Sequence, residues 1–146
     1  MRPRLWHHIL TGISAAALLG VTVWTAVRWG SLPDRIPSHF DAAGAADGFG
    51  HKSGLIMLLF LGWMIFGMLT AVSFFPEAWN VPNRNPRTLA AAADMIAVMK
   101  LVTVLMFAWL VFCSVQGRGL GAWFLPVTMV GMFAPLVHLL IAAARK

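Results

Sequence analysis

Four long apolar runs constrain this chain more than any other feature of its sequence. They cover residues 5–29, 54–75, 86–116 and 120–144. A helix rises 1.5 Å per residue, so about 20 apolar residues cross the roughly 30 Å hydrocarbon core of a bilayer. The runs therefore predict an all-α fold, a bundle of four transmembrane helices, and one integral membrane domain over residues 1–146.

The low charge of the chain agrees with this prediction. Only 11% of its residues are charged, whereas a soluble domain carries about 25%. The net charge of +6 comes from residues at the ends of the apolar runs, where Lys and Arg contact anionic lipid. The sequence has no run of basic residues and no nucleic-acid-binding motif, so no nucleic-acid partner is expected. The single cysteine, Cys113, forms no internal disulfide and no Cys-based metal site.

Residues that favour the ends of helices indicate where the predicted helices begin and end. Ser53 is expected to cap the second helix, and Pro76 to end it. Asn85 and Pro86 have the pattern of an N-cap followed by proline at the first helical position. Pro135 lies inside the fourth run, where a kink is expected because proline removes a backbone hydrogen bond.

Few ionisable residues interrupt the apolar runs. Lys100 is expected to snorkel to the nearer interface, with a buried functional lysine as the alternative. Asp94 is six residues away and so lies on another helical face. His7, His8 and His138 are expected at headgroup level, with a metal or proton site there as the alternative. The absence of a central carboxylate weighs against a proton-coupled transporter.

The distribution of Lys and Arg in short loops predicts the orientation, because cytoplasmic loops carry the excess of these residues. If the N-terminus is cytoplasmic, the inner segments carry six such residues, and the outer segments carry four. The inner ones are Arg2, Arg4, Arg84, Arg87, Arg145 and Lys146, and the outer ones are Arg28, Arg35, Lys52 and Arg118. We therefore predict cytoplasmic N- and C-termini and an extracytoplasmic loop over residues 30–53.

This outer loop is the one polar segment between apolar runs. It holds two of the five histidines and three of the five acidic residues. Prolines favour extended backbone before them, and glycines supply turns, here at Ala43-Gly44 and Asp47-Gly48. The loop is therefore expected to be compact, with residues 36–41 as a short strand or a polyproline-like segment and with Phe40 and Phe49 docked on the helix ends. The residues expected to set its backbone are Pro33, Pro37, Gly44, Gly48 and Gly50.

Three interpretations of the polar loop residues remain open. In the first, Asp34, Asp41 and Asp47 cap turns and His39 bonds to backbone, so the loop is a lid. In the second, His39, Phe40, Asp41 and Asp47 form a surface that binds an external ligand or peptide. In the third, His39, Asp41, Asp47 and His51 bind a zinc-like divalent metal, since imidazole and carboxylate groups suit such ions.

The loop also resembles a family signature. The string Leu32-Pro-x-x-Ile-Pro-x-His-Phe-Asp41, followed by Gly44-x-x-Asp-Gly-x-Gly-x-Lys-Ser53, is similar to the N-terminal domain of unknown function in SdpI-like proteins, the Sdp-type immunity family of bacteria. Members usually have Asn where this chain has Asp41, and His51 is an additional residue here. Full-length relatives add a further multi-helix region. The resemblance implies a toxin-defence protein of the bacterial cytoplasmic membrane.

We therefore expect a non-enzymatic binding, protection or sensing protein that acts through its outer loop. The chain contains no catalytic motif, and no cofactor is expected, apart from the divalent metal of the third interpretation. Expected partners are membrane lipids, an antimicrobial peptide or toxin, and another membrane protein or a second copy. Ala16 and Gly20 have the spacing of a close helix contact, either within the bundle or in a dimer. The alternatives are a small transporter, an accessory subunit, or a metal-binding membrane protein.

Overall fold

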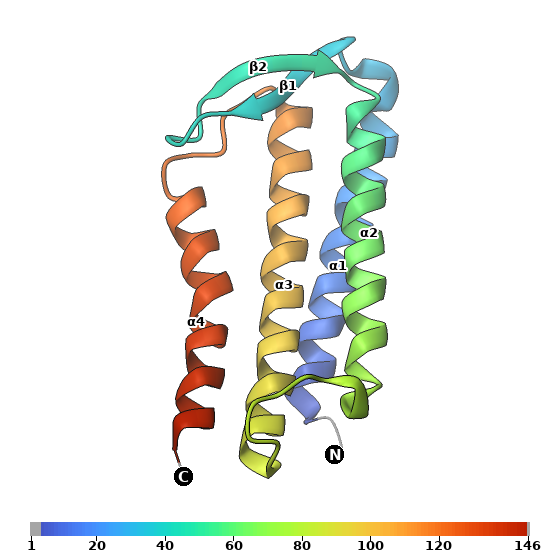
Figure 1. Cartoon of the computed structure of the whole chain (residues 1–146). Helices are drawn as coiled ribbons and strands as arrows, with labels where there is room; N and C mark the ends of the chain where they lie inside the picture. The colour runs from blue at the N-terminus through green and yellow to red at the C-terminus, as the bar shows by residue number, and fades with distance from the viewer. Residues whose placement is uncertain (1–3, 146) are drawn as a thin grey trace.

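The computed structural model of the chain describes residues 4–145. These form four α-helices and one antiparallel hairpin, with short 3-10 turns at Trp29–Ser31 and Pro76–Ala78. The elements are α1 (Leu5–Arg28), β1 (Arg35–Phe40), β2 (Ala46–His51), α2 (Gly54–Ser73), α3 (Pro86–Gln116) and α4 (Phe124–Ala144). The hairpin lies across one end of the bundle and both chain termini lie at the other (Figure 1). We call these the hairpin end and the terminal end.

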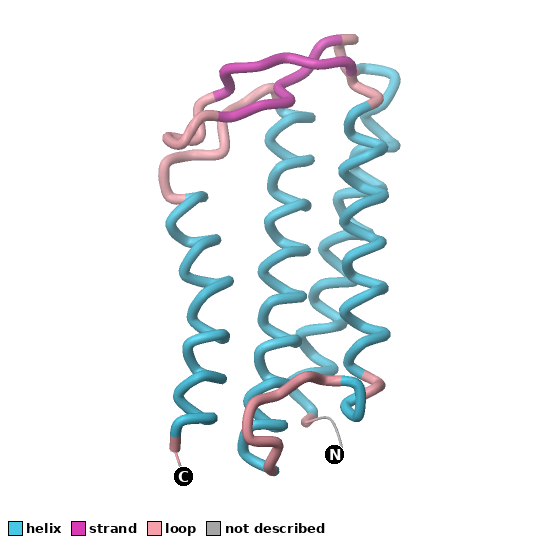
Figure 2. Tube along the Cα trace, viewed as in Figure 1, coloured by secondary structure: helices cyan, strands magenta, loops and turns pink. Residues whose placement is uncertain are grey.

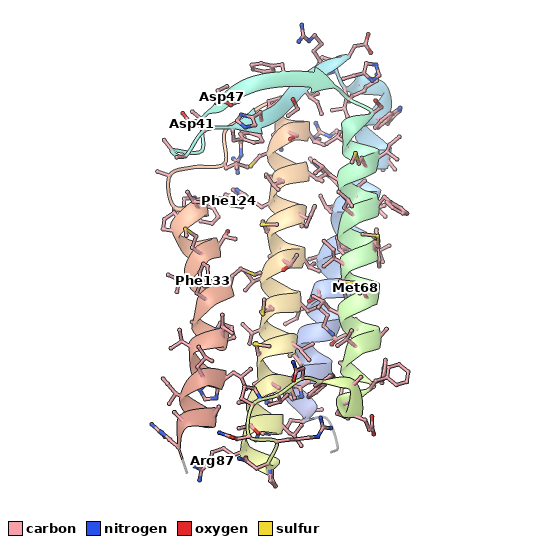
Figure 3. All side chains as sticks on the ribbon, viewed as in Figure 1. Asp41, Asp47, Met68, Arg87, Phe124 and Phe133 are labelled. Carbon is pink, nitrogen blue, oxygen red and sulfur yellow. The ribbon has the colours of Figure 1, made fainter. Side chains whose placement is uncertain are left out.

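All four helices are long and apolar enough to cross a membrane, and the only strands among the described residues are those of the hairpin (Figure 2). This confirms the predicted all-α bundle and makes the chain a multi-pass membrane protein. The exposed surface of the helices is apolar, as lipid contact requires. Met68 on α2 and Phe133 on α4 are each more than half exposed (Figure 3).

The central helix is α3, which packs against each of the other three. Close approach depends on glycines that face it. A Cβ at Gly62 of α2 would lie 3.5 Å from the Cβ of Phe107 on α3 and 3.1 Å from a methyl group of Leu18 on α1. One at Gly131 of α4 would lie 2.9 Å from a methyl group of Val102 on α3. Gly20 has open space around it. The expected close helix contact at Gly20 is therefore absent within the bundle, where glycines of α2 and α4 have that role, and a contact of Gly20 in a dimer stays a prediction.

The helix boundaries follow the expected end signals with two exceptions. Asn85 caps α3, because its Oδ1 accepts hydrogen bonds from the backbone N–H groups of Arg87 and Thr88 at 2.9 and 3.0 Å. Ser53 occupies the cap position of α2, but its side chain makes no hydrogen bond to the helix. α4 begins at Phe124 rather than near residue 120, because Gly121 has a φ of +89°, which a right-handed helix does not allow.

Candidate functional site

The polar loop of the sequence is a two-stranded hairpin. β1 and β2 pair from Arg35 opposite His51 to Phe40 opposite Ala46, with two register shifts along the way. The turn between them begins at Asp41, whose Oδ1 accepts the N–H of Ala45 at 2.8 Å and whose carbonyl accepts the N–H of Gly44 at 2.9 Å. The predicted turn at Ala43-Gly44 is confirmed. The predicted turn at Asp47-Gly48 is wrong, because both residues lie within β2, where Gly48 pairs with His39.

Glycines in the hairpin lie where a side chain would collide. A Cβ at Gly48 would lie 2.8 Å from the Cβ of His39, and one at Gly50 would lie 2.9 Å from the Ser38 hydroxyl oxygen. Gly44 has a φ of +78°, in the left-handed region, and a Cβ there would lie 2.6 Å from the carbonyl oxygen of Gly121. The geometry at these positions therefore requires glycine.

Two aliphatic residues, rather than the phenylalanines, dock the hairpin on the helices. Leu32 and Ile36 are buried in one core cluster with Leu55 of α2. Phe40 is half-buried, but Phe49 is 52% exposed. The expected docking of Phe49 is wrong because alternate side chains of β2 point away from the bundle, and Phe49 is one of those.

The structure brings together two of the four residues considered for a metal. His39 Nδ1 lies 2.6 Å from Asp47 Oδ1, and since a carboxylate only accepts, the imidazole carries the proton on Nδ1. Asp41 is used by the turn, and His51 Nδ1 lies 2.9 Å from the Ser53 hydroxyl. Within residues 4–145 no group of three potential ligands meets. The hairpin therefore presents an exposed His–Asp pair rather than a set of converging ligands.

One end of the hairpin is attached to its own flanking segments through Lys52. The Lys52 ammonium lies 3.3 Å from the Asp34 carboxylate and donates to the Leu32 carbonyl at 3.3 Å. The backbone N–H of Lys52 also donates to the Asp34 carbonyl at 3.0 Å. These bonds join the start of β1 to the end of β2, so they fix the hairpin at the end where it connects to α1 and α2.

The turn of the hairpin is attached to α3 through Leu120. The Leu120 N–H donates to the Gly44 carbonyl at 2.7 Å, and the Leu120 carbonyl accepts the indole N–H of Trp109 at 3.0 Å. The Trp109 ring lies 5.3 Å from that of Trp123, measured between centroids. The hairpin turn is thus coupled through one residue to an aromatic cluster within the bundle.

This aromatic cluster borders an apolar groove of about 710 Å³ between α1, α3 and α4. Its lining is contributed by the halves of these helices nearer the hairpin end, and it includes Trp24, Met106, Trp109, Phe112, Trp123 and Phe124. Asp41 and Asp47 lie at the turn end of the hairpin, above Phe124 (Figure 3). The exposed polar pair and the apolar groove therefore occupy the same end of the molecule.

A second polar region lies at the terminal end, and its contacts were not expected from the sequence. Lys100 is only 3% exposed, so the expected snorkelling is wrong. Its ammonium donates to the hydroxyls of Thr11 on α1 and Thr70 on α2. His7 contacts Asp94 at 2.8 Å, whereas His138 is exposed on α4. A sequence signal was present, because threonines in two neighbouring apolar runs supply polar partners for a lysine in a third.

Comparison with known proteins adds one match. The model of a domain of unknown function, DUF1648, matches residues 16–63. This range covers about a third of the chain and contains the second half of α1, the whole hairpin and the first half of α2. No curated protein matches the chain, and no solved structure matches it. The matched segment is centred on the hairpin, and its domain is uncharacterised.

Proposed function

We propose that this chain is an SdpI-like protein of the bacterial cytoplasmic membrane that binds a membrane-active peptide or toxin at the hairpin end and so protects the cell. In this proposal both termini are cytoplasmic and the hairpin is extracytoplasmic. The excess of Lys and Arg near the terminal end supports this orientation. The match of the hairpin-bearing segment to an uncharacterised domain is compatible with a shared role for the hairpin.

The observation that carries the proposal is the apolar groove beneath the hairpin turn. A membrane-active peptide has an apolar face that partitions into lipid and a polar face that stays at the interface. The groove offers aromatic and aliphatic contacts to the first of these faces. His39 and Asp47, exposed on the hairpin, offer polar contacts to the second. The arrangement thus suits an amphipathic ligand that enters from the outer leaflet.

Susceptibility of bacterial cells to peptides tests this function. Cells that lack the gene are complemented with the wild-type chain, with Asp47→Asn, or with Gly20→Leu, which places a side chain in the open space of the groove lining. Against a panel of apolar and cationic membrane-active peptides, the wild type should raise the inhibitory concentration of at least one peptide, and both variants should lose that protection. Glu77→Gln, at the terminal end, is the matched control and should protect fully.

Two results would contradict the proposal. One is unchanged susceptibility to every peptide in the panel, with the protein present in the membrane. The other is full protection by both variants, because then neither the groove nor the hairpin would be involved.

The same groove supports a second candidate function, that of an accessory subunit. In that case a transmembrane helix of another protein, or of a second copy, fills the groove between α1 and α4. Close helix packing in lipid depends on shape, and Gly20 in the lining has open space around it, which leaves room for a helix. Co-purification of a stoichiometric partner that is lost in Gly20→Leu, with no effect on peptide susceptibility, would favour this function.

A further inference from the structure

Lys100 is a buried cation without a buried counter-ion. Its ammonium donates to Thr11 Oγ1 at 2.7 Å and to Thr70 Oγ1 at 3.3 Å, and it lies 5.8 Å from the centre of the Phe66 ring. None of the ion pairs formed within residues 4–145 includes Lys100. An ammonium has three donors, and two are used by hydroxyls. A positive charge held this way inside an apolar bundle is costly unless an anion approaches it.

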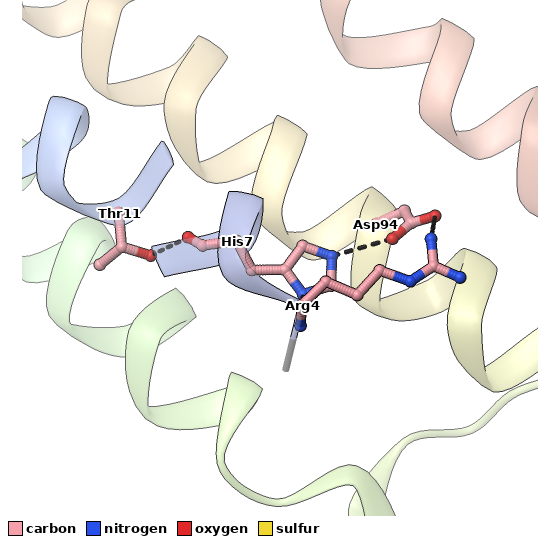
Figure 4. A network of polar contacts seen from close by, with 4 residues as sticks. All are labelled: Arg4, His7, Thr11 and Asp94. Atoms are coloured by element: carbon pink, nitrogen blue, oxygen red, sulfur yellow. Dashed lines mark hydrogen bonds and ion pairs between the residues drawn. The ribbon is translucent and has the colours of Figure 1, made fainter. Parts of the chain in front are cut away.

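The nearest acidic residue on the same helix is already engaged. Asp94 accepts from the Arg4 guanidinium at 3.4 Å and lies 2.8 Å from Nε2 of His7 (Figure 4). His7 Nδ1 accepts the backbone N–H of Arg4, so its proton is on Nε2 and points to Asp94. Six residues separate Asp94 from Lys100, a rise of about 9 Å. Asp94 is therefore paired with α1 and does not neutralise Lys100.

A cavity of about 400 Å³ leads from the terminal end to Lys100. It lies between α1, α2 and α3, and the chain around Trp79 closes part of it. Its polar lining carries basic groups from Arg4, His7 and His8 in addition to Lys100. The one acidic residue in the lining, Glu77, is exposed. Lys100 supplies the positive charge of the deep part, since Asp94 engages Arg4 and His7, whereas His8 and the Glu77 carboxylate are exposed to solvent.

The depth of Lys100 fits a group that enters from the membrane surface. Its partner Thr70 is three residues before the end of α2 at Ser73, a distance of about 4.5 Å along the axis. The ammonium is therefore about one helical turn inside the apolar span. Phe74, Trp79 and Ile96 contribute apolar surface to the same cavity, so it accommodates a charged group together with an apolar attachment.

We propose that this cavity binds an oxyanion of the phosphate class, with Lys100 as the main cationic contact and the third N–H of its ammonium as donor. Two sources supply this chemistry, the headgroup of an anionic phospholipid and free phosphate in solution. In either case the bound anion compensates the positive charge of Lys100. It also stabilises the packing of α1, α2 and α3 at the terminal end. This site is separate from the groove and does not depend on the function proposed for the hairpin.

Thermal unfolding in a phosphate-free maltoside detergent tests the proposal. The seven tryptophans report unfolding by intrinsic fluorescence while either inorganic phosphate or phosphatidylglycerol is titrated at constant ionic strength. At least one titrant should raise the midpoint of the wild type in a saturable way. A charge-assisted hydrogen bond contributes about 1.5–3 kcal/mol, so Lys100→Met should weaken the apparent affinity by about 10- to 100-fold.

Two further variants test whether the titrant acts at the cavity that contains Lys100. Arg87→Gln removes a charge at the same end of the molecule outside the cavity (Figure 3), and should respond like the wild type. Ala93→Leu fills part of the cavity while keeping Lys100, and should weaken the response. Without any titrant, Lys100→Met should be at least as stable as the wild type, because it removes an uncompensated buried charge.

The two titrations separate the sources. A response to phosphatidylglycerol alone assigns the site to a lipid headgroup, and a response to inorganic phosphate alone assigns it to a soluble anion. No response to either titrant overturns the proposal. An equal response in wild type and Lys100→Met also overturns it, because the anion would then bind elsewhere.

Discussion

At the scale of single residues, glycine marks the points where two segments meet too closely for a side chain. Gly44 is the strongest case, because it has a positive φ and because a Cβ there would lie 2.6 Å from the carbonyl oxygen of Gly121. Its carbonyl also accepts the Leu120 N–H that joins the hairpin to α3. Other glycines, such as Gly67 of α2, have open space around them.

Gly44→Val is therefore expected to destabilise the hairpin end. The left-handed conformation alone costs a residue with a side chain about 1–2 kcal/mol, and contact with Gly121 adds to this. The measurement is the thermal midpoint of the purified protein in detergent. Gly67→Ala is the matched control, since alanine favours a helix by up to about 1 kcal/mol over glycine, and its midpoint should not fall. Equal midpoints for Gly44→Val and wild type would contradict the role of Gly44.

The His39–Asp47 pair is expected to contribute little to stability. Both side chains are substantially exposed, 74% and 45%, and such pairs contribute less than about 1 kcal/mol. Asp47→Asn should therefore leave the thermal midpoint nearly unchanged. Any loss of peptide protection in this variant then reports on binding. A large fall in the midpoint would instead make Asp47 a structural residue and remove the variant as a test of binding.

At the scale of elements, α4 depends on one neighbour. It packs mainly on α3, and Gly131 allows the approach, since a Cβ there would lie 2.9 Å from a Val102 methyl group. A helix that is held by one interface responds strongly to a change in that interface.

Gly131→Ala is expected to cost about 1–3 kcal/mol through overpacking, measured as a lower thermal midpoint. Val102→Ala in the same chain removes the methyl groups that the new Cβ meets, so the double variant should recover part of the loss. The single Val102→Ala variant completes the cycle. Strictly additive effects would mean that the two residues do not contact each other.

At the scale of the whole molecule, the two ends differ in chemistry. The hairpin end combines an exposed polar hairpin with an apolar groove, whereas the terminal end holds Arg4, His7, Asp94 and Lys100 in and beside a polar cavity. The orientation of the chain decides which of these ends meets the cell exterior. It is therefore the first property of the whole molecule to establish.

Cysteine labelling measures this orientation. Ser38→Cys places an exposed thiol on β1 and Asn83→Cys places one at the terminal end. In intact cells a membrane-impermeant maleimide should label position 38 only, and position 83 should react after lysis. The native Cys113 is buried, so the wild-type chain should stay unlabelled in intact cells. Labelling of position 83 alone would reverse the proposed orientation and place the groove in the inner leaflet.

Much of the architecture could be predicted from local sequence. The spans, the Asn85 cap and the Ala43-Gly44 turn follow from apolar length and from preferences of single residues. The partners of Lys100 and the apolar groove could not be predicted, because each depends on residues from three helices. The Asp47-Gly48 turn was a wrong prediction for a related reason, since the pairing of β2 with β1 on both sides of Asp47 outweighs the local turn preference.

The sequence by itself determined that this is a four-span membrane protein with one compact polar segment, because span length and the placement of polar residues are local properties. Only the tertiary structure decided what the polar residues contact. It paired His39 with Asp47, used Asp41 in a turn, and buried Lys100 between two threonines. The physical reason is that a helix has several faces, and the charge and volume opposite each face depend on which neighbouring helices pack there.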